Sequence, residues 1–181
     1  MGGTGVWTSF STSSRSICRR SGGNPGSRGL VMMVVLDSWA ILAWLQGEPA
    51  GAVVRDLLQW AEGDEEAGGR VKARLERNLG RPRLFVSLIN LGEVFYILGR
   101  RIGEQKARET VAEVRAGGIE VVPVSEDLVF EAAAFKIRYP LAYADAFALA
   151  TARRQGGVLV TGDPELKAVK EVSVLWIGEG G

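Results

Sequence analysis

The sequence contains no histidine and only one cysteine, Cys18, in 181 residues. The lack of histidine excludes Ser-His-Asp hydrolysis, histidine-based acid–base cleavage and histidine-ligated zinc. A single cysteine can form neither an internal disulfide nor a cysteine zinc site, so we expect a reducing, cytoplasmic environment. Any metal would therefore bind through oxygen atoms, which favours Mg²⁺ or Mn²⁺ over zinc.

Long apolar runs are also missing. No run approaches the ~18 residues that a membrane-spanning helix requires, so we expect no membrane association. Hydrophobic residues make up 46% of the chain and charged residues 24%, shares that are typical of globular proteins. The length corresponds to one folded domain with a substantial core.

Acidic residues are absent from the beginning of the chain. Residues 1–31 are rich in Gly and Ser and contain four arginines. Because such a segment buries too little apolar surface to offset the cost of ordering, we predict a disordered or mis-assigned extension, and a folded domain over 32–181. Its composition is also compatible with a transit peptide. Without these arginines the formal charge of +1 becomes −3, so net charge does not indicate an acidic partner.

The remainder alternates between short apolar runs and segments with helical periodicity. Strands are predicted over 34–36, 84–86, 119–122, 158–160 and 172–176. Helices are predicted over 38–46, 50–63, 88–101, 103–115, 126–138 and 143–155. The stretch 64–82 is charged and is interrupted by Gly68-Gly69 and by Gly80 with Pro82. We predict a segment at the periphery of the domain that is helical in part. Continuous apolar strands alternating with helices indicate an α/β protein with a mostly parallel sheet, covered on both faces.

Two aspartates follow predicted strands. Asp37 comes directly after 34–36, and Asp163 follows 158–160 after two residues. Since the carboxyl ends of parallel strands meet at one edge of a sheet, we expect both side chains at that edge. Helix capping is the alternative for each, because Asp163-Pro164 resembles an N-cap followed by a first-turn proline.

Two further acids interrupt apolar rows of predicted helices. Asp145 lies one turn from Leu141 and from Leu149, and Glu93 occupies the corresponding place between Ile89 and Ile97. An ionised carboxylate in such a position should be paired or coordinated. A buried arginine partner or a backbone amide would provide a purely structural explanation. One site shared with Asp37 and Asp163 would explain all four.

Four carboxylates in one place would repel one another, by roughly 4 kcal/mol per pair at a separation of ~4 Å and an effective dielectric constant of ~20. Divalent cations remove this cost. Paired metals can activate water and neutralise charge that develops on a phosphodiester. The implied reaction is therefore phosphodiester hydrolysis.

The four acidic segments, in this order, resemble the PIN-domain family, and in particular the VapC-type toxins of toxin–antitoxin pairs. The matching stretches are VVLDS (34–38), SLINLGEV (87–94), YADAFALATA (143–152) and VLVTGDPE (158–165), within a resemblance that covers roughly 32–178. The extension before Met32 and the stretch 64–82 depart from the family pattern.

This resemblance implies a three-layer α/β/α sandwich with a mainly parallel sheet of about five strands. It also implies Mg²⁺- or Mn²⁺-dependent cleavage of single-stranded RNA, a cognate antitoxin and a homodimer. The catalytic and metal-binding positions fall on Asp37, Glu93, Asp145 and Asp163. Ser38 and Thr161 match small polar positions that assist metal or phosphate binding.

Lys167 is the cation best placed to contact RNA, because it follows the Asp163 loop. The pairs Arg100-Arg101 and Arg153-Arg154 end predicted helices, where the helix dipole alone favours cations.

Two other functions are considered. A haloacid-dehalogenase-like phosphatase needs a second aspartate two residues after the first, where this chain has Trp39, and the acidic pair of receiver-like domains is not evident. A catalytically silent PIN-like module that binds RNA or protein is the remaining alternative.

Overall fold

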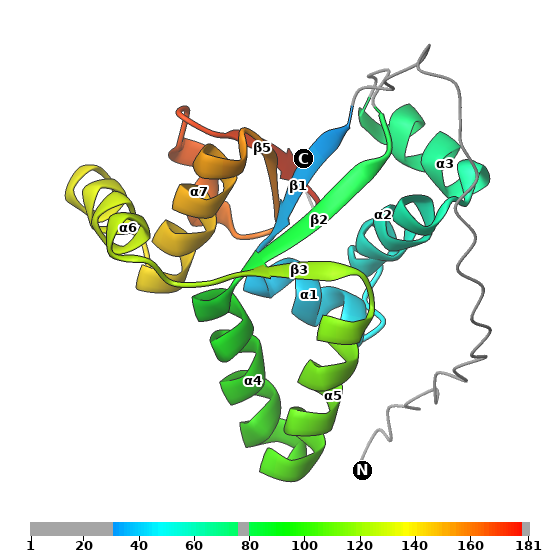
Figure 1. Cartoon of the computed structure of the whole chain (residues 1–181), viewed down its shortest axis with the longest axis horizontal. Helices are drawn as coiled ribbons and strands as arrows, with labels where there is room; N and C mark the ends of the chain where they lie inside the picture. Colours follow the sequence, from blue (N-terminus) through cyan, green and yellow to red (C-terminus); the bar gives the residue numbers. More distant parts are fainter. Residues whose placement is uncertain (1–30, 76–79, 179–181) are drawn as a thin grey trace, which may run out of the picture.

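The computed structural model describes residues 31–75 and 80–178, which form a single sheet with helices on both faces (Figure 1). The strands are β1 (Met32–Leu36), β2 (Pro82–Ser87), β3 (Ile119–Val122), β4 (Val158–Thr161) and β5 (Ser173–Trp176). The helices are α1 (Ser38–Leu45), α2 (Gly51–Glu62), α3 (Glu65–Leu75), α4 (Leu88–Ile102), α5 (Glu104–Ala116), α6 (Glu126–Arg138), α7 (Tyr143–Gln155) and the 3₁₀ helix η1 (Pro164–Ala168). Apart from Val31, the predicted N-terminal extension lies outside the described residues and stays a prediction.

The sheet has five strands in the order β3-β2-β1-β4-β5, and every neighbouring pair is parallel. The α/β fold predicted from the alternating pattern is therefore confirmed. The register pairs Leu36 at the end of β1 with Val160 in β4. Both strands thus end at the same edge of the sheet, and the segments that follow them lie side by side.

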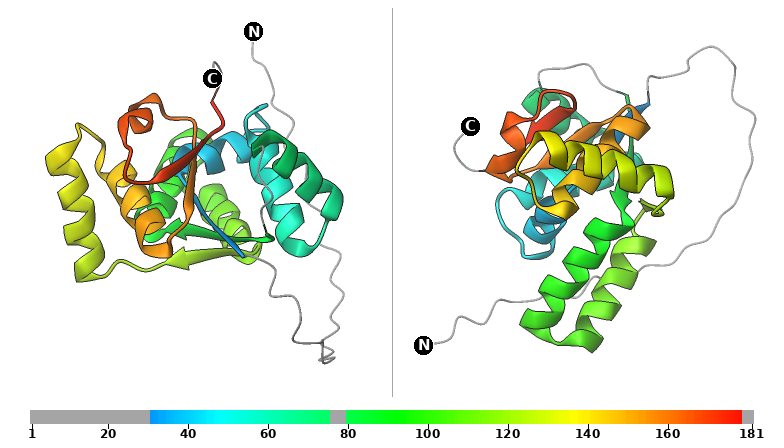
Figure 2. Two further views of the ribbon diagram at one scale, coloured as in Figure 1. Left: turned by 90° about the horizontal axis from the view of Figure 1, so that it is seen from above. Right: turned by 90° about the vertical axis from the view of Figure 1, so that its left-hand side faces the viewer.

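Side chains along the central strand β1 alternate between two cores. Val34 and Leu36 belong to a cluster built with α1, α2 and α4, whereas Val35 belongs to a second cluster built with α6 and α7. This alternation follows from the two-residue repeat of a strand, and both faces are apolar because both are covered. Figure 2 shows the sheet between these two helical layers. None of the helices in the described ranges is both long and apolar enough to cross a membrane.

The prediction that 64–82 is helical in part is confirmed by α3. The expected interruption at Gly68-Gly69 is wrong, because α3 runs through both residues. Gly68 lies against the buried ring of Trp60 in α2, and a Cβ atom at Gly68 would be only 2.5 Å from the Trp60 Nε1 atom. The glycine therefore allows two helices to approach each other closely, and the small cost of glycine within a helix is outweighed by this packing.

Candidate active site

Asp37 lies immediately after β1 and is buried, with 1% of its surface exposed. Its Oδ1 atom accepts a hydrogen bond from the backbone N–H of Ser38 at 2.7 Å, so the aspartate does cap α1. Its Oδ2 atom accepts from Thr161 Oγ1 at 2.8 Å, across 124 residues of sequence. Capping therefore occupies only one carboxylate oxygen, and the other ties the end of β1 to the end of β4.

Asp163 follows β4 and caps η1, as its sequence context predicted. Its Oδ1 atom accepts from the backbone N–H of Glu165 at 2.9 Å. Its own backbone N–H donates to Thr161 Oγ1 at 3.0 Å. The Thr161 hydroxyl thus accepts from the Asp163 backbone while donating to Asp37, which links the two acidic segments directly.

Asp145 and Glu93 reach the same region from two helices that pack against each other. Asp145 lies in the first turn of α7 and is 7% exposed, whereas Glu93 in α4 is half-buried. Contacts between α4 and α7 bring these segments together. Within the described ranges, the ion pairs that form involve none of the four acids. The structural alternative of a buried arginine partner is therefore wrong for the described part of the chain.

The four acids share one electrostatic environment. Burial raises the pKa of Asp37 to about 6, against the lowering effect of its hydrogen bonds, and the charges of Glu93 and Asp163 add to the rise. Burial also raises the pKa of Asp145 to about 7. The charges of Asp37, Asp163 and Glu93 contribute to that second shift, which a hydrogen bond with the Ala142 backbone partly offsets. Each buried aspartate is thus destabilised as an anion first by burial and then by its acidic neighbours.

Asn90 is a site residue that sequence analysis missed. Its side chain is fully buried in α4, and its Nδ2 atom lies 3.2 Å from Asp37 Oδ1, 3.1 Å from Ser38 Oγ and 3.1 Å from the carbonyl oxygen of Ala144. Ser87, the N-cap of α4, donates to Asn90 Oδ1 and accepts from the Asn90 backbone N–H. This amide joins α1, α4 and α7, the three helices around the buried acids. The signal available in the sequence was the Ser-x-x-Asn pattern directly after a strand.

Replacing Asn90 with aspartate is expected to destabilise the protein by about 2–4 kcal/mol at pH 8, because a buried donor becomes a further carboxylate beside Asp37. The loss should be smaller at pH 5, where the buried carboxyl groups are protonated. Urea unfolding at the two pH values measures both effects. Gln105→Glu makes the same amide-to-acid change on the exposed surface of α5, where it removes only an exposed hydrogen bond to Glu109, and should alter stability by less than about 1 kcal/mol. Equal effects of the two variants would contradict the bridging role of Asn90.

The basic side chains considered in the sequence as RNA contacts have different neighbours in the structure. Arg153 and Arg154, at the end of α7, pair with Glu131 of α6 at 2.8 and 2.5 Å. They therefore hold the α6–α7 pair together, away from the first turn of α7 that carries Asp145. Lys167 in η1 places its ammonium group 3.9 Å from the centre of the Trp176 ring, close to the Asp163 loop in sequence.

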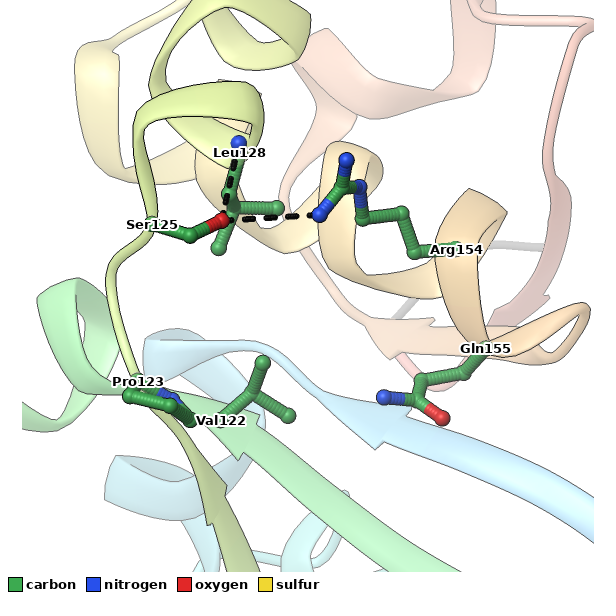
Figure 3. A pocket seen from close by; sticks show the side chains of 6 residues that line it. All are labelled: Val122, Pro123, Ser125, Leu128, Arg154 and Gln155. Carbon is green, nitrogen blue, oxygen red and sulfur yellow. Dashed lines mark hydrogen bonds between the residues drawn. The ribbon is translucent and has the colours of Figure 1, made fainter.

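A cavity of about 520 Å³ lies between β3, the start of α6 and the end of α7 (Figure 3). Its lining residues are Val122, Pro123, Ser125, Leu128, Arg154 and Gln155. None of the four acids lines it, and the guanidinium of Arg154 is already engaged by Glu131 and Asp127. The cavity is therefore separate from the acidic site.

Within residues 31–75 and 80–178, no group of three or more acidic or cysteine side chains is arranged to hold a metal ion as it stands. The chemistry of the residues nevertheless fits Mg²⁺ or Mn²⁺. The candidate donors are all oxygen atoms. Asp37 and Asp145 have raised pKa values and form no ion pair with a cation of the described residues. Mg²⁺ commonly uses one or two carboxylates and keeps several waters, so it does not require a closed set of three protein ligands.

A parallel sheet between two helical layers, with buried carboxylates beyond its carboxyl edge, defines an α/β domain with an acidic site at one rim. A family model of the PIN domain matches residues 34–172. The chain therefore belongs to the PIN-domain family, which supports a nuclease in general.

Solved structures with the same fold include toxin–antitoxin proteins. The chain is similar to VapBC-1 from nontypeable Haemophilus influenzae, with a TM-score of 0.57, 14% identity, and coverage of 81% of this chain and 98% of the other. DNA-bound VapBC from Salmonella typhimurium gives a TM-score of 0.55 at 14% identity, with coverage of 81% and 98%. A toxin–antitoxin complex from Klebsiella pneumoniae gives 0.51 at 20% identity, with coverage of 81% and 99%. At these identities the similarity concerns the fold alone. No curated protein matches the chain.

Proposed function

We propose that this protein is a Mg²⁺- or Mn²⁺-dependent ribonuclease that hydrolyses phosphodiester bonds of single-stranded RNA. The observation that carries the proposal is the pair of buried aspartates, Asp37 and Asp145, whose pKa values are raised by burial and by other acids. A fold would not retain such a cluster for stability, because it opposes folding at neutral pH. A bound divalent cation would offset the repulsion and supply a Lewis acid and an activated water.

The residues of the site have distinct roles in this proposal. Asp37, Glu93, Asp145 and Asp163 would hold the cation, which would supply charge neutralisation and an activated water at the scissile phosphate. Thr161 and Ser38 act through Asp37: the Thr161 hydroxyl donates to Asp37 Oδ2, and the Ser38 backbone donates to Oδ1. These bonds fix the carboxylate in one orientation before substrate binds. Lys167 contributes a positive charge for an RNA phosphate.

The protein is further proposed to act as the toxin of a toxin–antitoxin pair, with a cognate antitoxin that blocks the site, and to form a homodimer in the cytoplasm. The fold shared with the Klebsiella pneumoniae toxin–antitoxin complex and the VapBC structures supports an antitoxin partner.

A second candidate is a catalytically silent PIN-like module that binds RNA or protein. One observation favours it: in the described part of the chain, the acids form no ready-made group of three ligands. A silent module would not require a divalent cation for any of its interactions.

Incubation of the purified protein with single-stranded RNA separates the two candidates. We expect cleavage with Mg²⁺ or Mn²⁺, no cleavage with EDTA, and recovery when Mn²⁺ is restored in excess. A single-stranded DNA of the same sequence tests the preference for RNA. RNA binding without cleavage under all metal conditions would favour the silent module and contradict the ribonuclease.

A further inference from the structure

The indole ring of Trp39 lies against Gly162, in the turn that follows β4. Trp39 belongs to the first turn of α1, two residues after Asp37, and Gly162 lies between Thr161 and Asp163. A Cβ atom added to Gly162 would lie 2.3, 2.4 and 2.7 Å from Cζ3, Cη2 and Cε3 of the indole. These three successive ring atoms are almost equally distant, which indicates that the backbone meets the face of the ring. Trp39 therefore leaves no room for any side chain at position 162.

Space, rather than backbone conformation, is what requires glycine at position 162. The described glycines with positive φ are Gly47, Gly63, Gly103, Gly118 and Gly156, and Gly162 is not one of them. Position 162 therefore does not need the left-handed backbone conformation that favours glycine. The Trp39 ring supplies the three nearest atoms to a side chain at position 162, so the two positions are coupled through this steric contact.

This contact lies in the turn formed by residues 161–163. The turn carries one proposed metal ligand, Asp163, and is hydrogen-bonded to another, Asp37. Within the turn, Thr161 Oγ1 donates to Asp37 Oδ2 at 2.8 Å and accepts from the Asp163 backbone N–H at 3.0 Å. The Thr161 carbonyl oxygen also accepts from the Ile177 backbone N–H at 2.9 Å. These bonds fix the start of the turn to Asp37 and to the chain beyond β5. The Trp39 ring covers the middle of the turn, just before Asp163.

We propose that Trp39 and Gly162 form a positioning pair that holds Asp163 beside Asp37. The proposal rests on the ribonuclease function for its catalytic consequence, but its steric part is independent of activity. Trp39 comes from the segment of Asp37, and Gly162 comes from the segment of Asp163. Their contact therefore sets the distance between two acids that repel each other in the absence of a cation.

Packing alone is the simpler role for Trp39, whose partly buried ring also touches the first core cluster. The two roles predict different results. Loss of packing lowers stability and leaves the turnover of the folded fraction unchanged. Loss of positioning lowers kcat of the folded enzyme with little change in KM, because the misplaced group acts in the transition state more than in substrate binding.

The test uses Gly162→Ala, Trp39→Leu and the double variant in the full-length protein. Leucine lacks the three ring atoms that an alanine at 162 would meet. We expect Gly162→Ala to lower kcat by about 10-fold or more with KM changed less than about threefold. Trp39→Leu alone should lower kcat by about threefold, because the turn loses the ring that supports it, and the double variant should exceed Gly162→Ala by at least about threefold. Gly69→Ala, whose added Cβ has no neighbour within 4 Å, is the matched control and should cleave like the wild type.

A second readout needs no activity. Without metal, the melting temperature should fall by about 3 °C or more in Gly162→Ala, and the double variant should lose less than the sum of the losses of the two single variants. If Gly162→Ala melts like the wild type, or if the two losses simply add, the positioning pair is refuted. If the losses are non-additive as expected but the wild type does not cleave RNA with Mn²⁺, the ribonuclease function fails and the steric pair stands.

Discussion

Replacing Asp145 with asparagine is expected to lower RNA cleavage by at least about 10²-fold and, at pH 8 without metal, to raise the melting temperature. Asp145 is 7% exposed, and burial, followed by neighbouring carboxylates, raises its pKa to about 7. Its ionised form therefore opposes folding by roughly 4 kcal/mol at most, since each pKa unit corresponds to ~1.4 kcal/mol. A neutral amide of the same shape removes part of that penalty. Function and stability thus change in opposite directions.

Parallel cleavage and thermal-unfolding measurements on wild type and Asp145→Asn test this expectation. Asp127→Asn is the matched control, because Asp127 is highly exposed at the start of α6 and pairs only at the surface with Arg154. It should keep wild-type cleavage and change stability by less than about 0.5 kcal/mol. An Asp145→Asn protein that cleaves RNA at the wild-type rate would show that this carboxylate has no part in the reaction.

The second large effect concerns the pH dependence of stability. The folded-state pKa values of Asp37, about 6, and Asp145, about 7, both lie above the ordinary value of 3.8. Between about pH 4 and pH 7 the folded protein therefore retains protons that the unfolded chain has released. This contribution to stability is fully present below about pH 4 and is lost as the pH rises to about 7. The metal-free protein should therefore become less stable over that range by several kcal/mol, since each unit of pKa shift corresponds to ~1.4 kcal/mol.

Mn²⁺ should reverse this loss at pH 8, because it binds the ionised carboxylates of the folded state. A concentration 100 times the dissociation constant would stabilise by ~2.7 kcal/mol. At pH 5 the same addition should have little effect, since the cation must displace protons from the two aspartates. Denaturant unfolding with Mn²⁺ or EDTA at both pH values measures this coupling. A stabilisation by Mn²⁺ that is equal at pH 5 and pH 8 would contradict a site built on these two groups.

The sequence allowed the fold and the location of the acids to be predicted because both follow from local patterns. Apolar runs alternate with helical periods, which predicts a parallel sheet, and the short distance from each strand to Asp37 and Asp163 predicts a common edge. The apolar row around Asp145 likewise predicts burial, which the structure confirms.

The bridging role of Asn90 could not be predicted in this way. Its partners Asp37, Ser38 and Ala144 lie 52 to 54 residues away, and a buried amide leaves no trace in hydrophobic periodicity. Gly68 and Gly162 are a similar case, because the neighbours of each leave no room for a side chain. In the sequence they resemble breaks or turns, whereas the structure shows that each lies against a tryptophan ring from another segment.

The central claim is that Asp37, Glu93, Asp145 and Asp163 together hold a divalent cation. Isothermal titration of Mn²⁺ into the wild type and into Asp145→Asn at pH 8, in two buffers of different ionisation enthalpy, tests it directly. We predict saturable binding to the wild type with release of protons, and affinity at least about 10-fold weaker for the variant. Wild-type protein that takes up no Mn²⁺, or equal affinities for the two proteins, would contradict the claim.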